Sequence, residues 1–366
     1  MLFKKVENIE ERLLGSKSGG DHEETVQQDI VVLGGAGFLG SVLTNQLIQA
    51  GHNVTVLDRF MYDDHALRSI SDRINLSVYR GDIRDEDLLN ELLEGKETVI
   101  NLAAIVGDEA CRIDQEATID INTKAPGLIA EAAKRAGVKR LLHASTCSTY
   151  GKNGDNLLNE NSPLLPLSLY AGSKVESEKL LWSETGGGRS PACCIFRFST
   201  LFGYSFRPRF DLVVNTLTGH AWNRGAITIF GGNQWRPLLH VSDAARAIKM
   251  AAESDPGIIS GRIFNTGSSE LNMTIMDVGR LVKECLPETV MDVEDQICDE
   301  RDYRVDFSRI REELGFTPRH SVKTGIMELV QALESGEAVN TSEPVYSNYR
   351  WLSARPALVR EAVAVT

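Results

Sequence analysis

Tyr170 and Lys174 form the residue pair with the clearest chemical use in this sequence, because they stand four positions apart in a stretch with a helical pattern. At that spacing a phenol and an ammonium group share one face of a helix. A phenol is a weak base at neutral pH, but a neighbouring ammonium group favours its deprotonated form. The pair can then take a proton from a hydroxyl group whose carbon loses a hydride. Since the same spacing is common on helix surfaces, its meaning depends on its surroundings.

Hydroxyl side chains gather at the end of an apolar segment, residues 139–146, that precedes this pair. Thr146 and Ser148 face the same side under strand alternation, and Thr146 is the favoured partner for relaying a proton to Tyr170. Cys147 lies between them and points the other way, which favours a core position. Its alternative role is that of a thiol acid/base, which requires a nearby cation.

A glycine turn supplies the context that the pair needs. Gly34, Gly37 and Gly40 follow an apolar stretch and open an amphipathic one. In a strand–turn–helix unit, glycines at this spacing allow a sharp turn, a close approach to a pyrophosphate and close helix packing. The free N–H groups of the helix N-terminus then face the phosphates. The turn therefore predicts a dinucleotide site.

The choice of dinucleotide depends on the end of a second expected strand, residues 53–57. Asp58 follows it, where a carboxylate binds the adenosine ribose hydroxyls and repels the 2′-phosphate of NADP. Arg59 partly offsets that repulsion. On balance, Asp58 favours NAD over NADP as the cofactor.

Apolar strands alternate with helical patterns from residue 29 to about 200. Strands are expected at residues 29–34, 53–57, 76–80, 97–102, 139–146 and 192–198. Helices are expected at residues 38–51, 85–93, 117–136 and 168–184. This alternation predicts an α/β fold with a doubly wound parallel sheet of Rossmann type and ligands at the carboxyl ends of its strands.

Beyond residue 200 the pattern loosens, which predicts a smaller C-terminal α/β domain that binds the substrate and is partly interleaved with the first. Short strands are expected at 226–230 and 262–265, and helices at 241–254, 274–286, 306–313 and 321–335. A helical pattern over residues 3–13 and a linker at 15–20 mark an N-terminal extension. The expected divisions are therefore 1–28, 29–200, 201–336 and a tail, 337–366.

Composition narrows the possible partners. The 366 residues are 42% hydrophobic and 25% charged, with a formal net charge of −12, which argues against nucleic acid or an anionic membrane as a partner. No apolar stretch reaches membrane-spanning length, and no signal-peptide core is visible. Six scattered cysteines favour a reducing, cytoplasmic compartment. Seven dispersed histidines predict no metal site.

In order and spacing, these pieces resemble the extended short-chain dehydrogenase/reductase family, in its nucleotide-sugar epimerase/dehydratase branch, over roughly residues 29–335. The resemblance implies NAD as cofactor, a nucleotide-diphosphate sugar as substrate, and Thr146, Tyr170 and Lys174 as the catalytic set. Asp82 resembles the residue that bonds the adenine amine, and Asn122 a structural asparagine. The remaining cofactor positions implied are Phe38, Leu39, Ile83, Leu102, Ala103 and Ala104.

The substrate is expected to meet several charged residues. Arg236 and Arg301 match family positions that bind the nucleotide diphosphate. Arg207 and Arg209 suit a diphosphate through their guanidinium forks, or else pair on the surface. Asp108 and Glu109, expected in the loop after the fourth strand, either orient sugar hydroxyls, act as acid/base groups, or are solvated loop charges.

The residues after Thr146 bear on the reaction. Relatives that eliminate water usually carry an Asp-Glu pair there, where this chain has Cys147 and Ser148. We therefore expect an epimerase that oxidises its substrate to a keto sugar and returns the hydride, with Tyr170 as base. The alternatives are a 4-ketoreductase or other oxidoreductase, a dehydratase with an atypical acid/base group, and a non-catalytic dinucleotide-binding regulator.

The helices expected at 117–136 and 168–184 resemble a pair that forms a four-helix homodimer interface in relatives. Four apolar residues on them either supply that interface or pack inward: Leu128, Ala132, Leu180 and Leu181. A homodimer is the expected assembly.

Overall fold

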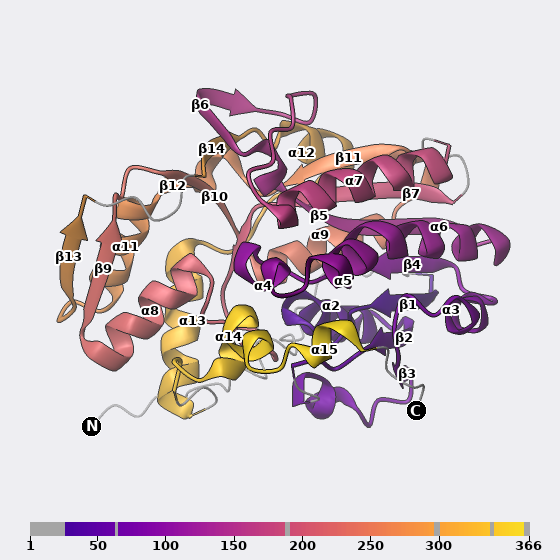
Figure 1. The fold of residues 1–366 in the computed structure, drawn as a ribbon, viewed down its shortest axis with the longest axis horizontal. Helices are drawn as coiled ribbons and strands as arrows, with labels where there is room; N and C mark the ends of the chain where they lie inside the picture. Colours follow the sequence, from indigo (N-terminus) through magenta and orange to yellow (C-terminus); the bar gives the residue numbers. More distant parts are fainter. Residues whose placement is uncertain (1–25, 63–64, 187–190, 296–300, 337–339, 362–366) are drawn as a thin grey trace.

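The computed structural model describes residues 26–62, 65–186, 191–295, 301–336 and 340–361. The helix expected at 3–13 and the linker expected at 15–20 lie outside these residues. The remaining elements form a large lobe built on one sheet and a smaller lobe beside it (Figure 1).

A seven-stranded parallel sheet forms the centre of the large lobe, in the order β11-β7-β5-β4-β1-β2-β3. Its strands are β1 (Asp29–Leu33), β2 (Asn53–Asp58), β3 (Leu76–Arg80), β4 (Thr98–Asn101), β5 (Arg140–Thr146), β7 (Ala192–Phe198) and β11 (Arg262–Thr266). All six strands expected before residue 200 are present, and the Rossmann-type parallel sheet is confirmed.

Helices cover both faces of this sheet, as the unbroken apolar strands require. Ile30 and Val32 of β1 face a core shared with α2 (Phe38–Gln49) and α9 (Val241–Glu253). Val31 and Leu33 face a second core, which α3 (Glu86–Leu93), α6 (Ala125–Arg135) and α7 (Leu169–Glu184) help to form. The alternation of β1 thus divides the apolar residues between two layers of helices (Figure 1).

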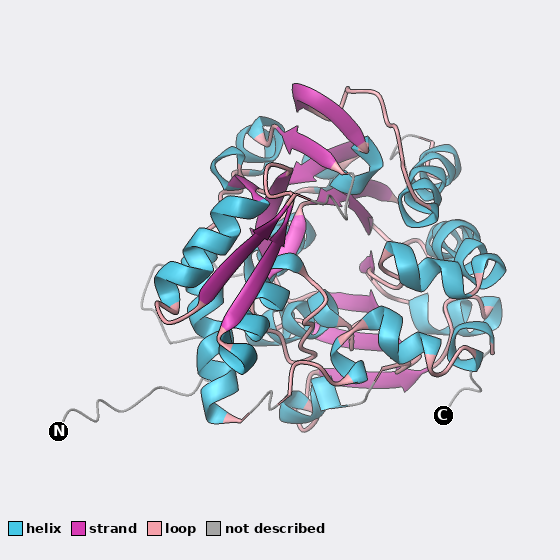
Figure 2. Cartoon of the chain, turned by 60° about the vertical axis from the view of Figure 1, so that its left-hand side comes forward, coloured by secondary structure: helices cyan, strands magenta, loops and turns pink. Residues whose placement is uncertain are grey.

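The smaller lobe contains three short sheets (Figure 2). They pair β12 (Asn272–Thr274) with β10 (Trp235–His240) and β8 (Thr200–Phe202), β13 (Val290–Glu294) with β9 (Ala226–Phe230), and β14 (Asp302–Val305) with β6 (Lys152–Leu158). Its helices include α8 (Val213–Arg224), α11 (Ile275–Cys285) and α13 (Val322–Ser335), while α12 (Ser308–Leu314) packs beside β11. The chain returns from this lobe to add β11 to the edge of the large sheet.

Two expectations before residue 200 need correction. The helix expected at 117–136 is divided into α5 (Gln115–Ile119), a π-helical turn at Asp120–Lys124, and α6. The turn places the Asn122 side chain against the main chain of Ile105, with bonds of 2.8 Å to its N–H and 2.9 Å to its carbonyl. Asp108 and Glu109, expected in a loop, are instead the first residues of α4 (Asp108–Ile113).

The apolar residues expected at a homodimer interface divide into two groups. Ala132 and Leu181 are buried within the single chain, so for these two the inward alternative holds. Leu128 and Leu180 are half-buried. The homodimer itself stays a prediction.

The C-terminal tail is part of the folded body. Its elements are a 3₁₀ turn (Pro344–Tyr346), α14 (Asn348–Ser353) and α15 (Ala357–Arg360). Leu352 and Val359 are 0% exposed and join the second core of the large lobe. In Figure 1 this yellow segment runs from the smaller lobe across the molecule toward β2.

Candidate active site

A cavity of about 1260 Å³ opens at the carboxyl ends of the large sheet's strands, where the smaller lobe faces them. It is lined by most of the residues expected at the site. The expected cofactor residues on its wall are Gly34, Gly37, Phe38, Leu39, Gly40, Asp58, Arg59, Ile83, Leu102, Ala103, Ala104, Tyr170 and Lys174. The other expected residues on its wall are Thr146, Ser148, Asp108, Glu109, Arg207, Arg209, Arg236 and Arg301.

The glycine turn has the geometry that a dinucleotide needs. Gly34 has a φ of +83°, and a Cβ there would lie 2.7 Å from the main-chain nitrogen of Ala103. No side chain caps the N-terminus of α2, which begins after Gly37, so its first N–H groups are free to bind phosphate. The turn therefore fits the pyrophosphate of NAD.

Asp58, at the end of β2, is hydrogen-bonded to the main chain of this turn. Its carboxylate accepts hydrogen bonds from the N–H groups of Ala36 at 2.9 Å and Phe60 at 2.8 Å. Burial raises the pKa of Asp58, although both of these bonds oppose the shift. The carboxylate lies on the cavity wall, where it also suits ribose hydroxyls.

Arg59 and Asp82 are already engaged by other residues. Arg59 Nε lies 3.2 Å from Asp82 Oδ2, and the guanidinium group donates to the carbonyls of Leu358 at 2.7 Å and Val359 at 3.2 Å. Asp82 also accepts hydrogen bonds from Arg84, from Nε at 3.0 Å and from Nη2 at 2.7 Å. Asp82 thus lies behind the cavity wall, which its neighbour Ile83 lines. Asn122 is likewise off the wall and holds the loop after β4.

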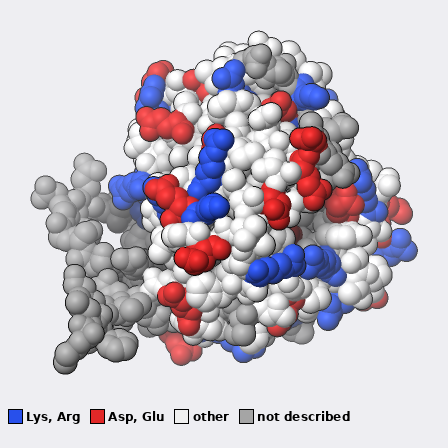
Figure 3. All heavy atoms as spheres, turned by 90° about the vertical axis from the view of Figure 1, so that its left-hand side faces the viewer, with Lys and Arg blue, Asp and Glu red and all other residues white. Residues whose placement is uncertain are grey.

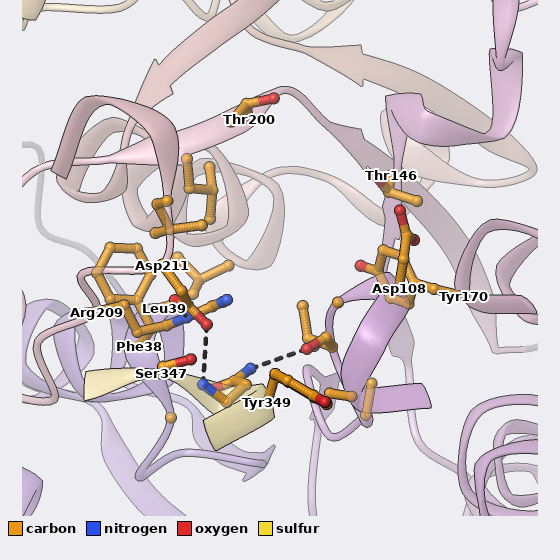
Figure 4. Close-up of a pocket in the computed structure, with 18 of the residues that line it drawn as sticks. Phe38, Leu39, Asp108, Thr146, Tyr170, Thr200, Arg209, Asp211, Ser347 and Tyr349 are labelled. Carbon is orange, nitrogen blue, oxygen red and sulfur yellow. Dashed lines mark hydrogen bonds and ion pairs between the residues drawn. The ribbon is translucent and has the colours of Figure 1, made fainter. Parts of the chain in front are cut away.

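The residues expected to be catalytic come from two adjacent elements, α7 and β5. Ser168 caps α7 by accepting from the N–H of Ala171 at 3.2 Å, and α7 presents Tyr170 and Lys174 to the cavity. Lys174 Nζ donates to the Ala144 carbonyl of β5 at 2.9 Å, and burial lowers the pKa of Lys174 to about 8. Figure 4 shows Tyr170 and Thr146 on one side of the cavity, opposite Phe38, Leu39 and Arg209.

The phenol of Tyr170 and the hydroxyls of Thr146 and Ser148 line the same cavity. Burial raises the pKa of the Tyr170 phenol, while Arg209 and Arg301 lower it. Thr146 Oγ1 donates to Ser148 Oγ at 3.1 Å and accepts from the Ser148 N–H at 3.1 Å. The two expected hydroxyls therefore lie together at the end of β5, and both line the cavity.

Cys147 lies in the interior, off the cavity wall. Its side chain is 0% exposed, and Sγ donates to the Arg197 carbonyl of β7 at 3.1 Å. Burial raises the pKa of this thiol strongly. These observations support the core position over an acid/base role.

Buried polar groups hold α7 against the sheet beneath the site. The guanidinium of Arg197 on β7 pairs with the Glu178 carboxylate of α7, with Nη2 2.6 Å from Oε2. His143 of β5 lies 3.2 Å from both Asn101 and Ser177, and burial lowers its pKa well below the ordinary value. A neutral His143 therefore joins β4, β5 and α7.

Arg236 and Arg301 lie together on the cavity wall, and their binding of the substrate diphosphate stays a prediction. Arg236 donates to the Arg301 carbonyl, and its guanidinium carbon lies 5.9 Å from the ring centre of Tyr303. Arg301 Nη1 is 3.6 Å from Asp108 Oδ2, and Asp108 also accepts from Ser168 Oγ at 2.6 Å. The carboxylate of Asp108 thus lies between the smaller lobe and the start of α7.

The other two expected arginines and Glu109 have different surroundings. Arg209 pairs with Asp211 at 2.8 Å, and Arg207 lies over the ring of Tyr62, whose centre is 3.8 Å from its guanidinium carbon. Glu109 is exposed and pairs with Arg112 at 2.9 Å, so it lies at the mouth of the cavity. Arg207 and Arg209 are both buried.

Several residues of the wall were not anticipated. They are Tyr62, Asp211, Ser168, Ser347, Asn348 and Tyr349. The capping position of Ser168 before the Tyr–Lys helix was a usable signal for that residue. The tail residues carried no comparable signal.

The surface and the described elements bear on other partners. On the face shown in Figure 3, basic and acidic side chains are interspersed and form no broad basic surface. No helix in the described part of the chain has both the length and the apolar character needed to cross a membrane. Within the same residues, no group of three or more His, Cys, Asp or Glu is arranged to hold a metal ion.

The strand order, the glycine turn and the Tyr–Lys pair in one cavity define a dinucleotide-dependent enzyme of the extended short-chain dehydrogenase/reductase type. The sequence matches the NAD dependent epimerase/dehydratase family over residues 30–267, and the chain belongs to this family. NAD is its cofactor.

The similar proteins include nucleotide-sugar dehydratases and epimerases. A dTDP-glucose 4,6-dehydratase of Streptomyces niveus is 28% identical over 82% of this chain and 91% of its own length. A UDP-glucose 4-epimerase of Streptomyces lividans is 29% identical over 62% of this chain and 72% of its own length. The solved structure of MoeE5 in complex with UDP-glucuronic acid and NAD has a TM-score of 0.72 and 29% identity, covering 84% of this chain and 99% of that one.

Proposed function

We propose that this protein is a nucleotide-sugar epimerase, which oxidises a sugar hydroxyl to a ketone and returns the hydride to the other face. The observation that carries the proposal is the position after Thr146. There, Cys147 faces the core and Ser148 carries a hydroxyl, so the catalytic set on this strand supports oxidation and reduction without an adjacent acid. The similarity to UDP-glucose 4-epimerases supports the same reaction.

In the proposed reaction, each residue of the site has a separate role. Bound NAD supplies the hydride acceptor. Tyr170 takes the proton of the reacting hydroxyl, Thr146 hydrogen-bonds that oxygen, and the buried ammonium group of Lys174 favours the phenolate. Arg236 and Arg301 bind the substrate diphosphate from the smaller lobe.

A dehydratase is the second candidate, and one observation favours it. The Asp108 carboxylate lines the same cavity, and its charge raises the pKa of Tyr170, so the two groups are near each other. Elimination of water needs an acid/base group beside the ketone, and Asp108 can fill that role from α4. The similarity to dTDP-glucose 4,6-dehydratases agrees with this reaction.

The product of the purified enzyme decides between them. We would incubate it with UDP-glucose and dTDP-glucose and analyse the products by mass spectrometry and chromatography. A product of unchanged mass but altered retention, formed without added reductant, supports the epimerase. A product lighter by one water, whose formation stops in Asp108→Asn, would establish the dehydratase instead. Turnover that requires stoichiometric NADH or NADPH would establish a reductase.

A further inference from the structure

Five residues of the cavity wall have buried polar atoms without a hydrogen-bond partner among the described residues: Arg59, Tyr62, Arg207, Gln234 and Asn348. In three of them, the atoms are the hydroxyl of Tyr62, Nε and Nη2 of Arg207, and Oδ1 of Asn348. Buried polar groups in folded proteins are nearly always bonded, so such a group of atoms is expected where a polar ligand completes the bonding. They come from three distant parts of the chain, after β2, after β8 and in the tail.

Arg207 is held at the cofactor end of the cavity by the segment that precedes it. Ser205 Oγ donates to the carbonyl of Phe38 at 2.6 Å, and it accepts from the N–H of Arg207 at 3.2 Å. It also lies 3.1 Å from Ser41 Oγ. This segment is therefore docked on the first turn of α2, where the free N–H groups of the phosphate-binding helix lie.

The surroundings of Arg207 favour a phosphate as its ligand. The side chain is 5% exposed, and burial lowers the pKa of Arg207 to about 10, partly opposed by Asp58. Stacking on Tyr62 compensates for some of the lost hydration. The two unpaired nitrogens still present a planar fork, which matches phosphate oxygens well.

We propose that Arg207 binds the diphosphate of the NAD cofactor, beside the N-terminus of α2, and does not bind the diphosphate of the nucleotide sugar. The proposal rests on NAD binding in this cavity and is independent of which sugar reaction follows. It separates Arg207 from Arg236 and Arg301, which lie on the smaller lobe's wall.

The proposal can be tested by calorimetry, which measures the affinity of NAD-free protein for NAD, ADP and adenosine. Wild-type protein should bind ADP more tightly than adenosine, and Arg207→Gln should weaken NAD and ADP by about 10- to 100-fold while leaving adenosine unchanged. Arg236→Gln is the matched control and should weaken only the nucleotide sugar. Arg207→Lys keeps the charge and should retain part of the preference for ADP. Unchanged NAD affinity in Arg207→Gln would overturn the proposal. Equal losses of affinity for ADP and for adenosine in the two Arg207 variants would overturn it as well.

A separate observation concerns the tail, which is bonded to both sides of the cofactor cleft. The Asn348 N–H donates to Asp211 Oδ2 at 2.9 Å, and its side-chain amide donates to the Val106 carbonyl at 3.0 Å. Figure 4 shows Ser347 beside Phe38 on one side of the cavity and Tyr349 between that side and the side that bears Tyr170. The start of α14 therefore joins the loop after β4 to the segment after β8.

Further along, the tail reaches the adenosine end of the site. Trp351 Nε1 donates to the Met61 carbonyl at 2.7 Å, and Arg59 donates to the carbonyls of Leu358 and Val359. Both Met61 and Arg59 directly follow β2 and line the cavity. The segment 341–361 thus follows the cleft from its middle to the end of β2.

We infer that residues 341–361 form a strap that closes over bound NAD and slows its exchange. The inference deepens the proposed epimerase, because an enzyme that returns its own hydride has no need to release the cofactor. It concerns cofactor exchange alone and is measurable whether or not any sugar reacts.

Exchange of bound NAD against isotopically labelled NAD measures the effect of the strap. Asn348→Ala removes the bond to Val106, and Trp351→Phe removes the bond to Met61 while keeping most of the ring. Each should speed exchange by about 10-fold, from the loss of one buried hydrogen bond. Ser353→Ala changes an exposed hydroxyl on the same helix and should exchange at the wild-type rate. Wild-type exchange in Asn348→Ala, Trp351→Phe and their double variant would overturn the inference.

Discussion

Lys174 Nζ donates a hydrogen bond to the main-chain carbonyl of Ala144 at 2.9 Å. This bond joins α7, which carries Tyr170, to β5, which ends at Thr146. Because Lys174 is 3% exposed, its ammonium group is held in the interior, one helical turn after Tyr170. The bond thus holds α7, with the proposed base Tyr170, against the strand that ends at Thr146.

Tyr170→Phe should lower kcat by about 100- to 10,000-fold, because it removes the proposed base and leaves the aromatic ring in place. The amount of NAD in the purified variant should stay at the wild-type level, since the glycine turn is unaffected. Tyr79→Phe, on β3 and away from the cavity wall, is the control and should retain full activity. Wild-type turnover by Tyr170→Phe would remove the phenol from the mechanism.

Lys174→Met should abolish turnover and yet raise the free energy of unfolding. Burial lowers the pKa of Lys174 from 10.5 in the unfolded chain to about 8 in the folded protein. Below pH 8 the folded protein therefore carries a buried charge that destabilises it relative to the unfolded chain. At pH 7 we expect a gain of about 1–3 kcal/mol, reduced by the lost bond to Ala144. The gain should shrink as the pH rises from 8 through 10.5, and it should be lost above 10.5, where neither state is charged.

Urea unfolding followed by circular dichroism between about pH 7 and 10 measures this dependence. Lys179→Met, on the exposed side of the same helix, serves as the control, since its surface pair with Glu176 contributes under about 1 kcal/mol. A destabilised Lys174→Met at every pH would show that the buried ammonium group stabilises the fold.

Cys147→Ser should keep near wild-type turnover. The serine hydroxyl can donate to the same Arg197 carbonyl, and the thiol lies off the cavity wall with a raised pKa. Alkylation of the folded protein by iodoacetamide, followed by peptide mass spectrometry, should leave Cys147 unmodified. A loss of activity of 100-fold or more in the variant, with intact NAD content, would restore the acid/base role for the thiol.

Glu178→Gln should destabilise the protein by about 3–5 kcal/mol, because it leaves the Arg197 charge buried without its carboxylate partner. Adding Arg197→Met to this variant should recover part of the loss, since the pair would then be replaced by neutral groups. Thermal unfolding of both variants tests this. Glu176→Gln, on the exposed face of α7, provides the surface comparison and should shift Tm little.

The large sheet could be predicted because each buried parallel strand is a nearly unbroken apolar run between turn residues. The glycine turn and the Tyr170–Lys174 spacing could be placed because both are local patterns. The division of the helix at 117–136 could not, since it depends on Asn122 bonding Ile105 across a turn of the fold. Local periodicity carries no sign of that contact.

The roles of the arginines and the tail depend on packing between distant segments. The sequence of Arg207 and Arg209 suggests a diphosphate, but only the docking of Ser205 on Phe38 shows which end of the cavity Arg207 occupies. Likewise, Asn348 acquires its place through Val106 and Asp211, each more than a hundred residues away. No pattern within the tail itself points to these partners.

The position of the tail also has a consequence for biosynthesis. Residues 341–361 leave the ribosome after the sheet, the glycine turn and α7, so the proposed strap can reach the cleft only after those elements have been synthesised. In the folded protein, Leu352 and Val359 join the second core of the large lobe, whose other fully buried residues all precede residue 200. A chain that stops before residue 341 would therefore contain the glycine turn and α7 but would lack the proposed strap.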